Sequence, residues 1–269
     1  MIKMIMSDMD GTLLDENGCL PEEFDEVMEL LKEHKILFAP ASGRQYYALL
    51  HQFKKYRDEF VFFAENGTYV SYREIELFSS PMENDDVQEI LAELEKMPDV
   101  YAVVCGKRGA YVTSHYRPFL AEMEKYYTQY IFVDDFAKID DDVIKISICD
   151  CDIHDAERTI YPHFKRYAEQ EKLQVAVSSN YWIDIMNFGI NKGVAIQKIQ
   201  DMLSIAPEEC AAFGDYLNDL EMMSAVKYSF AMENAHPQIK EAANYQARSN
   251  KEHGVMHAIR QLVANAQKN

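Results

Sequence analysis

Two aspartates near the start of the chain, Asp8 and Asp10, have the spacing of a catalytic or metal-binding pair. They follow directly after the largely apolar residues 1–6, which predict a buried strand of a parallel sheet. Ligands of such sheets bind just beyond the carboxyl ends of the strands. Residues two apart point to the same side of an extended chain, so these carboxylates converge and repel each other unless a cation lies between them. We therefore predict a Mg²⁺ site at this strand end.

The residues after the pair add a turn and a hydroxyl group. Gly11 permits a sharp turn or a close approach to a ligand, and the Thr12 hydroxyl can hold a phosphoryl oxygen. An Asp-x-Asp-Gly run is also found in ordinary solvated turns. A calcium-binding loop that starts at Asp8 is excluded, because it needs Gly at its sixth position and Glu at its twelfth, where this chain has Leu13 and Cys19.

Polar residues also follow later strands or begin a later helix. A strand expected over residues 36–40 leads to Ser42, and one over residues 210–213 leads to Asp215. Residues 191–193, which include Lys192, open a helix expected through residue 203. Because the carboxyl ends of parallel strands share one edge of a sheet, these residues are predicted to meet at one site. The full set is Asp8, Asp10, Ser42, Lys192, Asp215, Asn218 and Asp219.

The order of the expected elements predicts two domains. Strands and helices alternate at both ends of the chain, which is typical of a parallel sheet covered by helices. The middle of the chain instead shows helices on one face of an antiparallel sheet. We predict an α/β fold class, with a Rossmann-like parallel-sheet core over residues 1–82 and 188–269 and an inserted α/β cap domain over residues 83–187.

The composition limits the partners and the compartment. Among 269 residues, 27 are Lys or Arg and 45 are Asp or Glu, a formal net charge of −18. This charge repels nucleic acid and anionic membranes, so neither is an expected partner, and an anionic substrate needs a local positive pocket. The five cysteines are scattered, which favours neither a disulfide framework nor a zinc site. Without a long apolar stretch or a secretion signal, we expect a cytoplasmic protein; the oligomeric state stays open.

Four motifs, taken in order, resemble those of the haloacid dehalogenase-like phosphatases, and specifically of their Cof-type branch. The motifs are residues 8–13, 41–44, 191–193 and 214–219. The resemblance covers the whole chain, since the segment over residues 83–187 matches the α/β cap of that branch. The chain departs from the pattern at Asn191, where the family more often has a small hydroxyl residue, so one substrate contact stays open.

The resemblance implies a separate role for each aspartate of the first motif. Asp8 is the nucleophile that takes the phosphoryl group. Asp10 protonates the leaving alcohol and then activates the water that hydrolyses the aspartyl-phosphate. General chemistry agrees, because a carboxylate can serve as a covalent nucleophile and a second carboxyl beside it can act first as an acid and then as a base.

The resemblance also implies the ligands of the metal and of the phosphate. Mg²⁺ is held by Asp8, the backbone carbonyl of Asp10 and Asp215, while Asn218 and Asp219 place waters or support the ligands. The residues expected to bind the phosphoryl oxygens are Thr12, Ser42, Gly43 and Lys192.

Together these features predict a Mg²⁺-dependent phosphatase that hydrolyses small phosphate monoesters, so its partner is a small phosphorylated metabolite. A sugar-phosphate phosphomutase is the alternative enzyme. A non-catalytic regulator that binds a phosphorylated metabolite is a further alternative, although binding alone does not need Asp10. Sugar phosphates, pyridoxal phosphate and flavin-type phosphates all stay open as substrates. Candidate specificity residues in the cap are Tyr181, Trp182, Asp184 and Asn187.

Overall fold

The computed structural model describes residues 1–266, which divide into two compact units. The first unit combines Met1–Ser42, Lys55–Phe78 and the described part of Asn191–Asn269, and the second combines Gly43–Lys54 and Ser79–Ile190. The sequence predicts domain limits at residues 82 and 188, and these limits stay a prediction. Residues 43–54 group with the second unit, which the sequence did not indicate.

The first unit is built on a five-stranded parallel sheet with the strand order β14-β13-β12-β1-β2. Its strands are β1 (Met4–Ser7), β2 (Leu37–Pro40), β12 (Cys210–Gly214), β13 (Tyr228–Met232) and β14 (Tyr245–Ala247). Because helices cover both faces of the sheet, its central strands are buried along their whole length and are apolar except for Ser7 at the end of β1.

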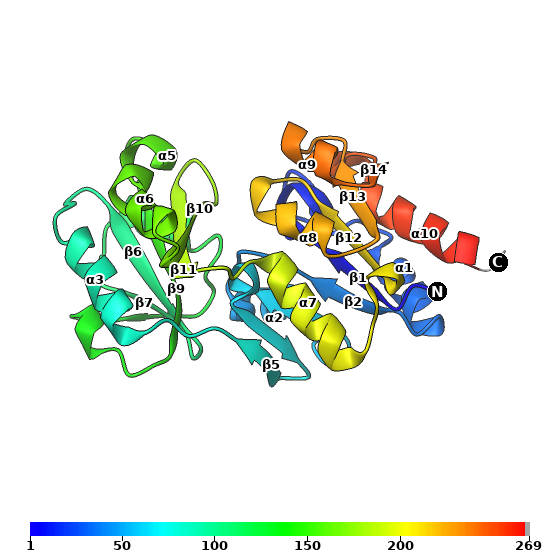
Figure 1. The fold of residues 1–269 in the computed structure, drawn as a ribbon, viewed down its shortest axis with the longest axis horizontal. Coiled ribbons are helices and arrows are strands. Elements are labelled where there is room, and N and C mark those ends of the chain that lie inside the picture. Colours follow the sequence, from blue (N-terminus) through cyan, green and yellow to red (C-terminus); the bar gives the residue numbers. More distant parts are fainter. Residues whose placement is uncertain (267–269) are drawn as a thin grey trace. The chain divides into compact units, whose positions relative to one another are not determined.

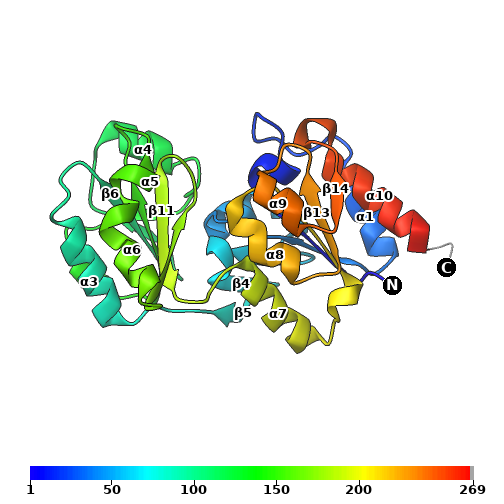
Figure 2. The same ribbon diagram turned by 45° about the horizontal axis from the view of Figure 1, so that its top comes forward.

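The covering helices form two layers, which Figure 1 and Figure 2 show from two directions. On one face, α1 (Phe24–Glu33) packs against α10 (Gly254–Ala266). On the other face lie α7 (Lys192–Leu203), α8 (Leu220–Ser224) and α9 (Pro237–Ala242). The buried side chains of α1 recur at helical spacing, which explains why this otherwise acidic segment packs on the sheet; they are Phe24, Val27, Met28 and Leu31.

The strand register determines where the predicted site residues leave the sheet. Ser7, the last residue of β1, lies opposite Phe213 of β12 on one side and opposite Pro40 of β2 on the other. The three strands are parallel, so the segments that follow them start from the same edge. These segments carry Asp8, Asp215 and Ser42.

A small antiparallel sheet completes the first unit. Its strands are β3 (Val61–Ala64), β4 (Tyr69–Tyr72) and β5 (Ile75–Ser79). In the turn after β3, Gly67 has a φ of 92°, a conformation that favours glycine. A Cβ atom at Gly67 would lie 2.7 Å from the carbonyl oxygen of Asn191, so the glycine lets this turn contact the start of α7.

The second unit contains a six-stranded sheet with the order β10-β11-β9-β6-β7-β8. Its strands are β6 (Tyr101–Gly106), β7 (Ala110–Val112), β8 (Tyr130–Phe132), β9 (Val143–Cys149), β10 (Leu173–Val177) and β11 (Trp182–Asn187). Neighbouring strands are antiparallel except β7 and β8, which are parallel. The hydrophobic core lies between one face of this sheet and the helices α3 (Asn84–Leu94), α5 (Ala156–Thr159) and α6 (Tyr161–Glu169).

The other face of this sheet carries α4 (Arg117–Met123), where the Phe119 ring packs against the rings of Tyr101 and Trp182. The second unit also holds the segment that contains α2 (Tyr46–Gln52). Just before α2, the buried Gln45 side chain exchanges two hydrogen bonds with the backbone of Gln129, at 2.7 and 3.1 Å. These bonds explain why this segment belongs to the second unit.

One predicted helix of the second unit is wrong in its extent. The sequence predicts a single helix over residues 155–171, whereas the structure has α5 and α6 with a break at Ile160. Pro162 lies in the first turn of α6. Proline lacks an N–H group and its ring clashes with the carbonyl four residues earlier, so it begins a helix rather than continuing one.

The predicted fold class is confirmed. A parallel sheet with helices on both faces forms one unit, and a largely antiparallel sheet with helices forms the other. Over residues 1–266, no helix has both the length and the apolar character needed to cross a membrane.

Candidate active site

The turn after β1 positions the first motif. Asp8 has extended backbone angles and its N–H donates to the carbonyl of Phe213 at 2.9 Å, which ties the end of β1 to β12. The turn Met9–Leu13 follows, with Gly11 at a φ of 80°. A Cβ atom at Gly11 would lie only 2.4 Å from Oδ2 of Asp215. The glycine is therefore required both by its backbone conformation and by the close approach of a second aspartate.

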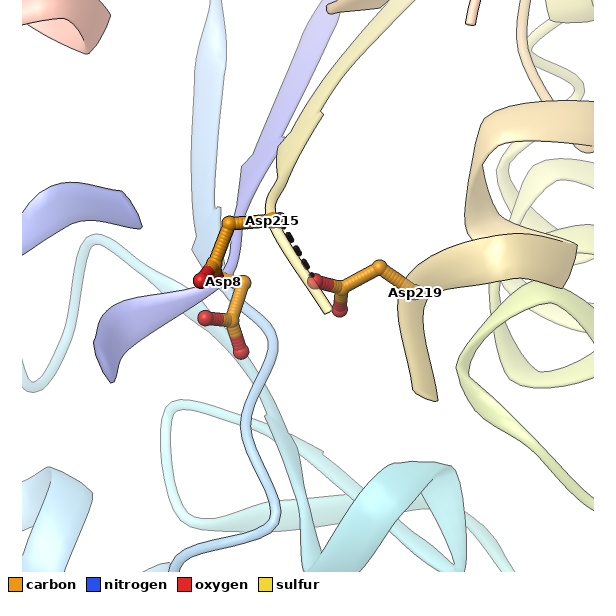
Figure 3. A group of neighbouring side chains, drawn as sticks. All are labelled: Asp8, Asp215 and Asp219. Carbon is orange, nitrogen blue, oxygen red and sulfur yellow. Dashed lines mark hydrogen bonds between the residues drawn. The ribbon is translucent and has the colours of Figure 1, made fainter. Parts of the chain in front are cut away.

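Three aspartates meet beside this turn. Figure 3 shows Asp8, Asp215 and Asp219, which each offer a carboxylate oxygen within 4.8 Å of the others. Asp215 follows β12, the neighbour of β1 in the sheet. Asp219 is buried, and its Oδ2 accepts from the N–H of Asp215 at 3.0 Å, drawn as the dashed line in Figure 3. A Cβ atom at Gly214 would lie 2.7 Å from Asp219, so this second glycine leaves room for the carboxylate.

A buried lysine lies among these carboxylates. Lys192 is 0% exposed, and its Nζ donates to Oδ1 of Asp8 at 2.5 Å and to Oδ1 of Asp219 at 2.6 Å. It is the first residue of α7, and the side chain of Asn191 caps this helix by accepting from the N–H of Val194 at 2.9 Å. The cap and the lysine are thus adjacent in the chain, so the start of α7 determines where the ammonium group lies.

Close packing of two helices brings the lysine to this depth. Gly193 follows Lys192, and a Cβ atom there would lie 2.4 Å from the carbonyl oxygen of Glu221 in α8. Any larger residue would push α7 away from α8. Because α8 directly follows Asp219, the glycine also keeps Lys192 within reach of that carboxylate.

The three aspartates and Lys192 do not balance one another in charge. Burial, and then repulsion from Asp219, hold the pKa of Asp8 well above its ordinary value. The same two causes raise the pKa of Asp215 to about 6. Burial alone lowers the pKa of Lys192, but attraction to Asp219 and Asp8 outweighs it, so the pKa of the ammonium is raised. One ammonium faces three carboxylates, and this surplus of negative charge is suited to a divalent cation.

The donor set suits a hard divalent cation such as Mg²⁺. Mg²⁺ prefers hard oxygen ligands and is commonly held by one or two carboxylates with the rest of its shell from water or substrate phosphate. Asp8, Asp215 and Asp219 supply carboxylate oxygens close to one another. A cation placed between them would favour their ionised forms and lower the pKa values that burial raises.

Two further residues of the first motif take different positions. The Thr12 hydroxyl donates to Oδ1 of Asp215 at 2.8 Å, so Thr12 orients an aspartate of the cluster. Asp10 is exposed in the same turn, and its charge contributes to the raised pKa of Asp215. Asp10 is therefore near the cluster yet accessible to solvent.

The second motif is divided between the two units. Ser42 is buried in the first unit, where its N–H donates to the carbonyl of Phe63 and its own carbonyl accepts from the N–H of Asn66, both at 2.9 Å. Gly43, the next residue, belongs to the second unit. There its carbonyl accepts from Nζ of Lys145 at 2.9 Å. Ser42 thus lies at the edge of the sheet from which Asp8 also leaves, whereas Gly43 is grouped with the second unit.

Asn218 has a hydrogen-bond partner outside the carboxylate cluster. Its Nδ2 donates to Oδ1 of Asn66 at 3.2 Å. Asn66 follows β3 and has a φ of 58°, so the turn after β3 supports the fourth motif. The structure places Asn218 next to Asp219 in the chain and pairs it with this turn.

Two asparagines that the sequence analysis did not single out hold the turn of the first motif. Nδ2 of Asn234 donates to the carbonyl of Gly11 at 2.7 Å, and Nδ2 of Asn250 donates to the carbonyl of Leu14 at 2.9 Å. The N–H of Asn250 in turn donates to Oδ1 of Asn234 at 3.2 Å. Asn234 lies two residues after β13, so a search for polar residues just beyond every strand end would have found it. Asn250 carries no comparable signal.

Comparisons with known proteins agree with these motifs. A model of the haloacid dehalogenase-like hydrolase family matches residues 5–259. The chain is 32% identical to the 5-amino-6-(5-phospho-D-ribitylamino)uracil phosphatase YbjI of Escherichia coli, over 97% of this chain and 96% of that protein. It is 26% identical to the HMP-PP phosphatase of Klebsiella pneumoniae, over 89% of this chain and 87% of that protein.

Solved structures resemble the whole chain. A crystal structure from Streptococcus mutans has a TM-score of 0.89 and 28% sequence identity, and the match covers 98% of this chain and 100% of that one. A haloacid dehalogenase-like hydrolase from Bacillus subtilis has a TM-score of 0.86 and 24% identity, with 97% and 100% covered. The second likeness concerns the fold alone.

Proposed function

Because the chain belongs to the haloacid dehalogenase-like hydrolase family and is a phosphatase, we propose that it hydrolyses small phosphate monoesters through an aspartyl-phosphate on Asp8, with Mg²⁺ as cofactor. The observation that carries the proposal is the meeting of Asp8, Asp215 and Asp219 around the buried ammonium of Lys192. A buried lysine bonded to two of three carboxylates is an unusual arrangement for stability alone, because each buried charge loses its hydration.

The reaction divides into two displacements. A carboxylate oxygen of Asp8 attacks phosphorus, and the bond from phosphorus to the leaving oxygen breaks as Asp10 gives that oxygen a proton. Water then attacks the same phosphorus and gives a proton to Asp10. The bond from phosphorus to Asp8 breaks, which releases inorganic phosphate and restores both carboxyl groups. The exposed position of Asp10 supports its role, since it must exchange protons with a leaving group and with water.

The proposed metal ligands are Asp8, the backbone carbonyl of Asp10 and Asp215, with Asp219 and Asn218 in support. When bound, Mg²⁺ neutralises charge on the carboxylates and on the phosphoryl oxygens. Asp219 holds the N–H groups of Asp215 and Tyr216, so its task is to orient the loop that carries Asp215. Thr12 orients Asp215 from the other side.

Because the protein is strongly acidic, the phosphoryl oxygens of the substrate need positively charged groups or hydrogen-bond donors at the site. Lys192 supplies the charge, and its bond to Asp8 also orients the nucleophile. We assign Ser42 and Gly43 to the same task, because Ser42 lies at the edge where Asp8 leaves the sheet and Gly43 follows it. Thr12 joins them only when substrate or metal draws its hydroxyl away from Asp215.

For the substrate we propose a small phosphorylated metabolite. The relatives named above carry the names of phosphatases that act on a phosphoribitylamino-pyrimidine and on HMP-PP, so these two compounds are the first to test. We assign selectivity to the cap, residues 83–187, where the sequence analysis named Tyr181, Trp182, Asp184 and Asn187. No specific observation favours a phosphomutase or a non-catalytic regulator.

The compartment is inferred from the sequence. The five scattered cysteines, which favour no disulfide framework, support a cytoplasmic enzyme. Fractionation of cells that express the tagged chain would test this, and recovery in a secreted fraction would contradict it.

The experiment that tests the proposed function measures inorganic phosphate released from a panel of esters with and without Mg²⁺. The two compounds above, sugar phosphates, pyridoxal phosphate and flavin mononucleotide make up the panel. Stoichiometric phosphate release that stops after chelation and returns with Mg²⁺ is the expected result. Product that keeps the phosphate would instead identify a mutase, and full activity after exhaustive chelation would contradict the metal assignment.

A further inference from the structure

The peptide bond between Ser42 and Gly43 is a place where the chain passes from the first unit into the second. Ser42 is held within the first unit by two backbone hydrogen bonds, to Phe63 and from Asn66. On the other side of the bond, the Gly43 carbonyl accepts from Nζ of Lys145 at 2.9 Å, within the second unit. Ser42, which is proposed to bind phosphate, is therefore followed directly by Gly43, whose carbonyl accepts a hydrogen bond from Lys145.

Lys145 lies in the middle of the six-stranded sheet. It belongs to β9, which has β11 on one side and β6 on the other. Its neighbour in the strand, Ile146, points into the hydrophobic core, so Lys145 faces the opposite side of the sheet. It is only 1% exposed. The ammonium group is thus buried although it is not part of that core.

A polar network surrounds this ammonium group. Asp184 of β11 lies 3.7 Å from Nζ of Lys145. The hydroxyl of Ser147 donates to Oδ1 of Asp184 at 2.5 Å, and the hydroxyl of Tyr127 donates to Ser147 at 2.8 Å. Ser147 and Asp184 are directly opposite in the register of β9 and β11, so the strand pairing itself brings them together. The Tyr127 ring also lies beneath the ammonium, 5.8 Å from Nζ to its centroid.

Stability alone does not account for this arrangement. A buried ion pair loses hydration on both sides, and apolar residues of similar volume in its place are often as stabilising or more so. What Lys145 does that an apolar residue cannot do is donate to the carbonyl of Gly43. The nearby Gln45 is fixed to the same unit through Gln129, so the whole start of this segment is held in place.

We propose that Lys145 is a positioning residue for phosphate binding: by holding the Gly43 carbonyl, with Asp184 as its counter-charge, it sets the orientation of the Ser42–Gly43 peptide. The groups of Ser42 and Gly43 that meet the phosphoryl oxygens are then oriented before substrate arrives. The inference rests on the proposed function, because it assigns a support to the phosphate site of that function.

The test compares the parent with Lys145→Met and with Lys145→Met/Asp184→Asn. The double variant removes both charges of the Lys145–Asp184 pair and keeps an oxygen that accepts from Ser147. The measured quantities are the inhibition constant for inorganic phosphate, KM for p-nitrophenyl phosphate, the Mg²⁺ concentration for half-activation and the unfolding midpoint. Lys172→Met is the matched control, since Lys172 is a surface lysine of the same unit bonded to Glu89 and Asp86.

Both Lys145 variants are expected to bind inorganic phosphate about tenfold more weakly and to raise KM by a similar factor, as the loss of one oriented charged donor implies. Half-activation by Mg²⁺ should not change, because the carboxylate cluster is untouched. The double variant should regain stability over Lys145→Met without regaining phosphate affinity. Lys172→Met should match the parent in phosphate affinity, KM and Mg²⁺ activation.

A purely structural role gives a different pattern. If the double variant recovered the parent's phosphate inhibition constant together with its stability, or if either folded variant bound phosphate like the parent, the inference would be wrong. If the Lys145 variants do not fold, Asp184→Asn alone tests the inference, because it keeps the ammonium group and removes its counter-charge. This variant must then weaken phosphate binding by a smaller factor than the Lys145 variants are expected to. A parent that releases no phosphate from any ester would instead refute the proposed function itself.

Discussion

The ammonium of Lys192 lies 2.5 Å from the carboxylate of Asp8, although 184 positions separate the two residues in the chain. The start of α7 and the end of β1 are thereby joined at the proposed nucleophile. The same ammonium reaches Asp219, so one buried cation connects three of the four motifs.

Removal of this cation should destabilise the protein. In Lys192→Met, buried carboxylates lose their counter-charge, and we expect a loss of about 3–5 kcal/mol in the free energy of unfolding at neutral pH. Urea unfolding measures this loss. Lys3→Met is the control: its partner Glu209 and Lys3 itself are partly exposed, so it should change stability far less than Lys192→Met. Equal effects of the two substitutions would contradict the buried pairing.

Substitutions at two glycines with positive φ distinguish the effect of backbone strain from the effect of steric crowding. Gly11→Ala and Gly18→Ala both force alanine into a left-handed conformation, at φ of 80° and 74°, which costs about 1–2 kcal/mol each. Only at Gly11 would the new Cβ meet Asp215; around Gly18 nothing lies within 4 Å. We expect Gly11→Ala alone to raise the Mg²⁺ concentration for half-activation. Activation curves that are alike for both variants would show that the close approach does not matter.

The raised pKa of Asp215 predicts a dependence of stability on pH in the metal-free protein. Its pKa of about 6 when folded exceeds the ordinary 3.8, so the folded state holds this proton more tightly than the unfolded chain. That contribution is complete at low pH and is lost as the pH rises from about 4 to about 6.

The substitution Asp215→Asn isolates this effect, because asparagine does not titrate. With a chelator present, the variant should gain about 1–3 kcal/mol relative to the parent between about pH 4 and about pH 7. Saturating Mg²⁺ should reverse the comparison at neutral pH, since only the parent offers this carboxylate. A stability difference that stays flat across this range without metal would contradict the assignment.

The hydrogen bond from Asn234 to the turn of the first motif should influence turnover. Asn234→Ala removes the donor to the Gly11 carbonyl, and a displacement of the turn should lower kcat/KM by about tenfold or more. Asn244→Ala is matched to it, because Nδ2 of Asn244 also donates to a backbone carbonyl, that of Lys227, but away from the cluster. Steady-state kinetics should show a loss only for the first variant. Parallel losses in both would point to general destabilisation.

Strand ends were the part of the site that the sequence could predict. Apolar runs before Asp8 and Asp215 indicate buried strands, and parallel strands bring their ends to one edge, so the meeting of these two carboxylates follows from pattern alone. The burial of Lys192 does not follow. It depends on the contact of Gly193 with Glu221, a tertiary packing that no local pattern encodes.

Other features were beyond the sequence for similar reasons. The strands β8 and β14 are three residues long, too short for an alternating pattern to appear. The Thr12 hydroxyl was expected to hold a phosphoryl oxygen, and it donates to Asp215, a choice set by distances across the site. The grouping of residues 43–54 with the second unit rests on hydrogen bonds to Gln129 and from Lys145, which are remote in the chain.

In the proposed mechanism, Asp8 carries the phosphoryl group and Asp10 moves the protons. Asp8→Asn keeps the size of the side chain but removes the nucleophile, so turnover should be lost. Asp10→Asn keeps the backbone carbonyl and removes the acid and base, a loss of roughly a hundred- to ten-thousandfold. With an activated ester, whose leaving group needs little protonation, the Asp10→Asn protein should still transfer phosphate to Asp8 and hydrolyse it slowly.

The most direct test is therefore to trap the adduct. The Asp10→Asn protein is mixed with p-nitrophenyl phosphate and Mg²⁺, quenched in acid and digested, and the peptide that contains residues 8–10 is analysed by mass spectrometry. The expected result is a phosphoryl group on Asp8 and none in the Asp8→Asn protein. Phosphate on any other residue, or an Asp8→Asn protein that turns over like the parent, would contradict the covalent mechanism.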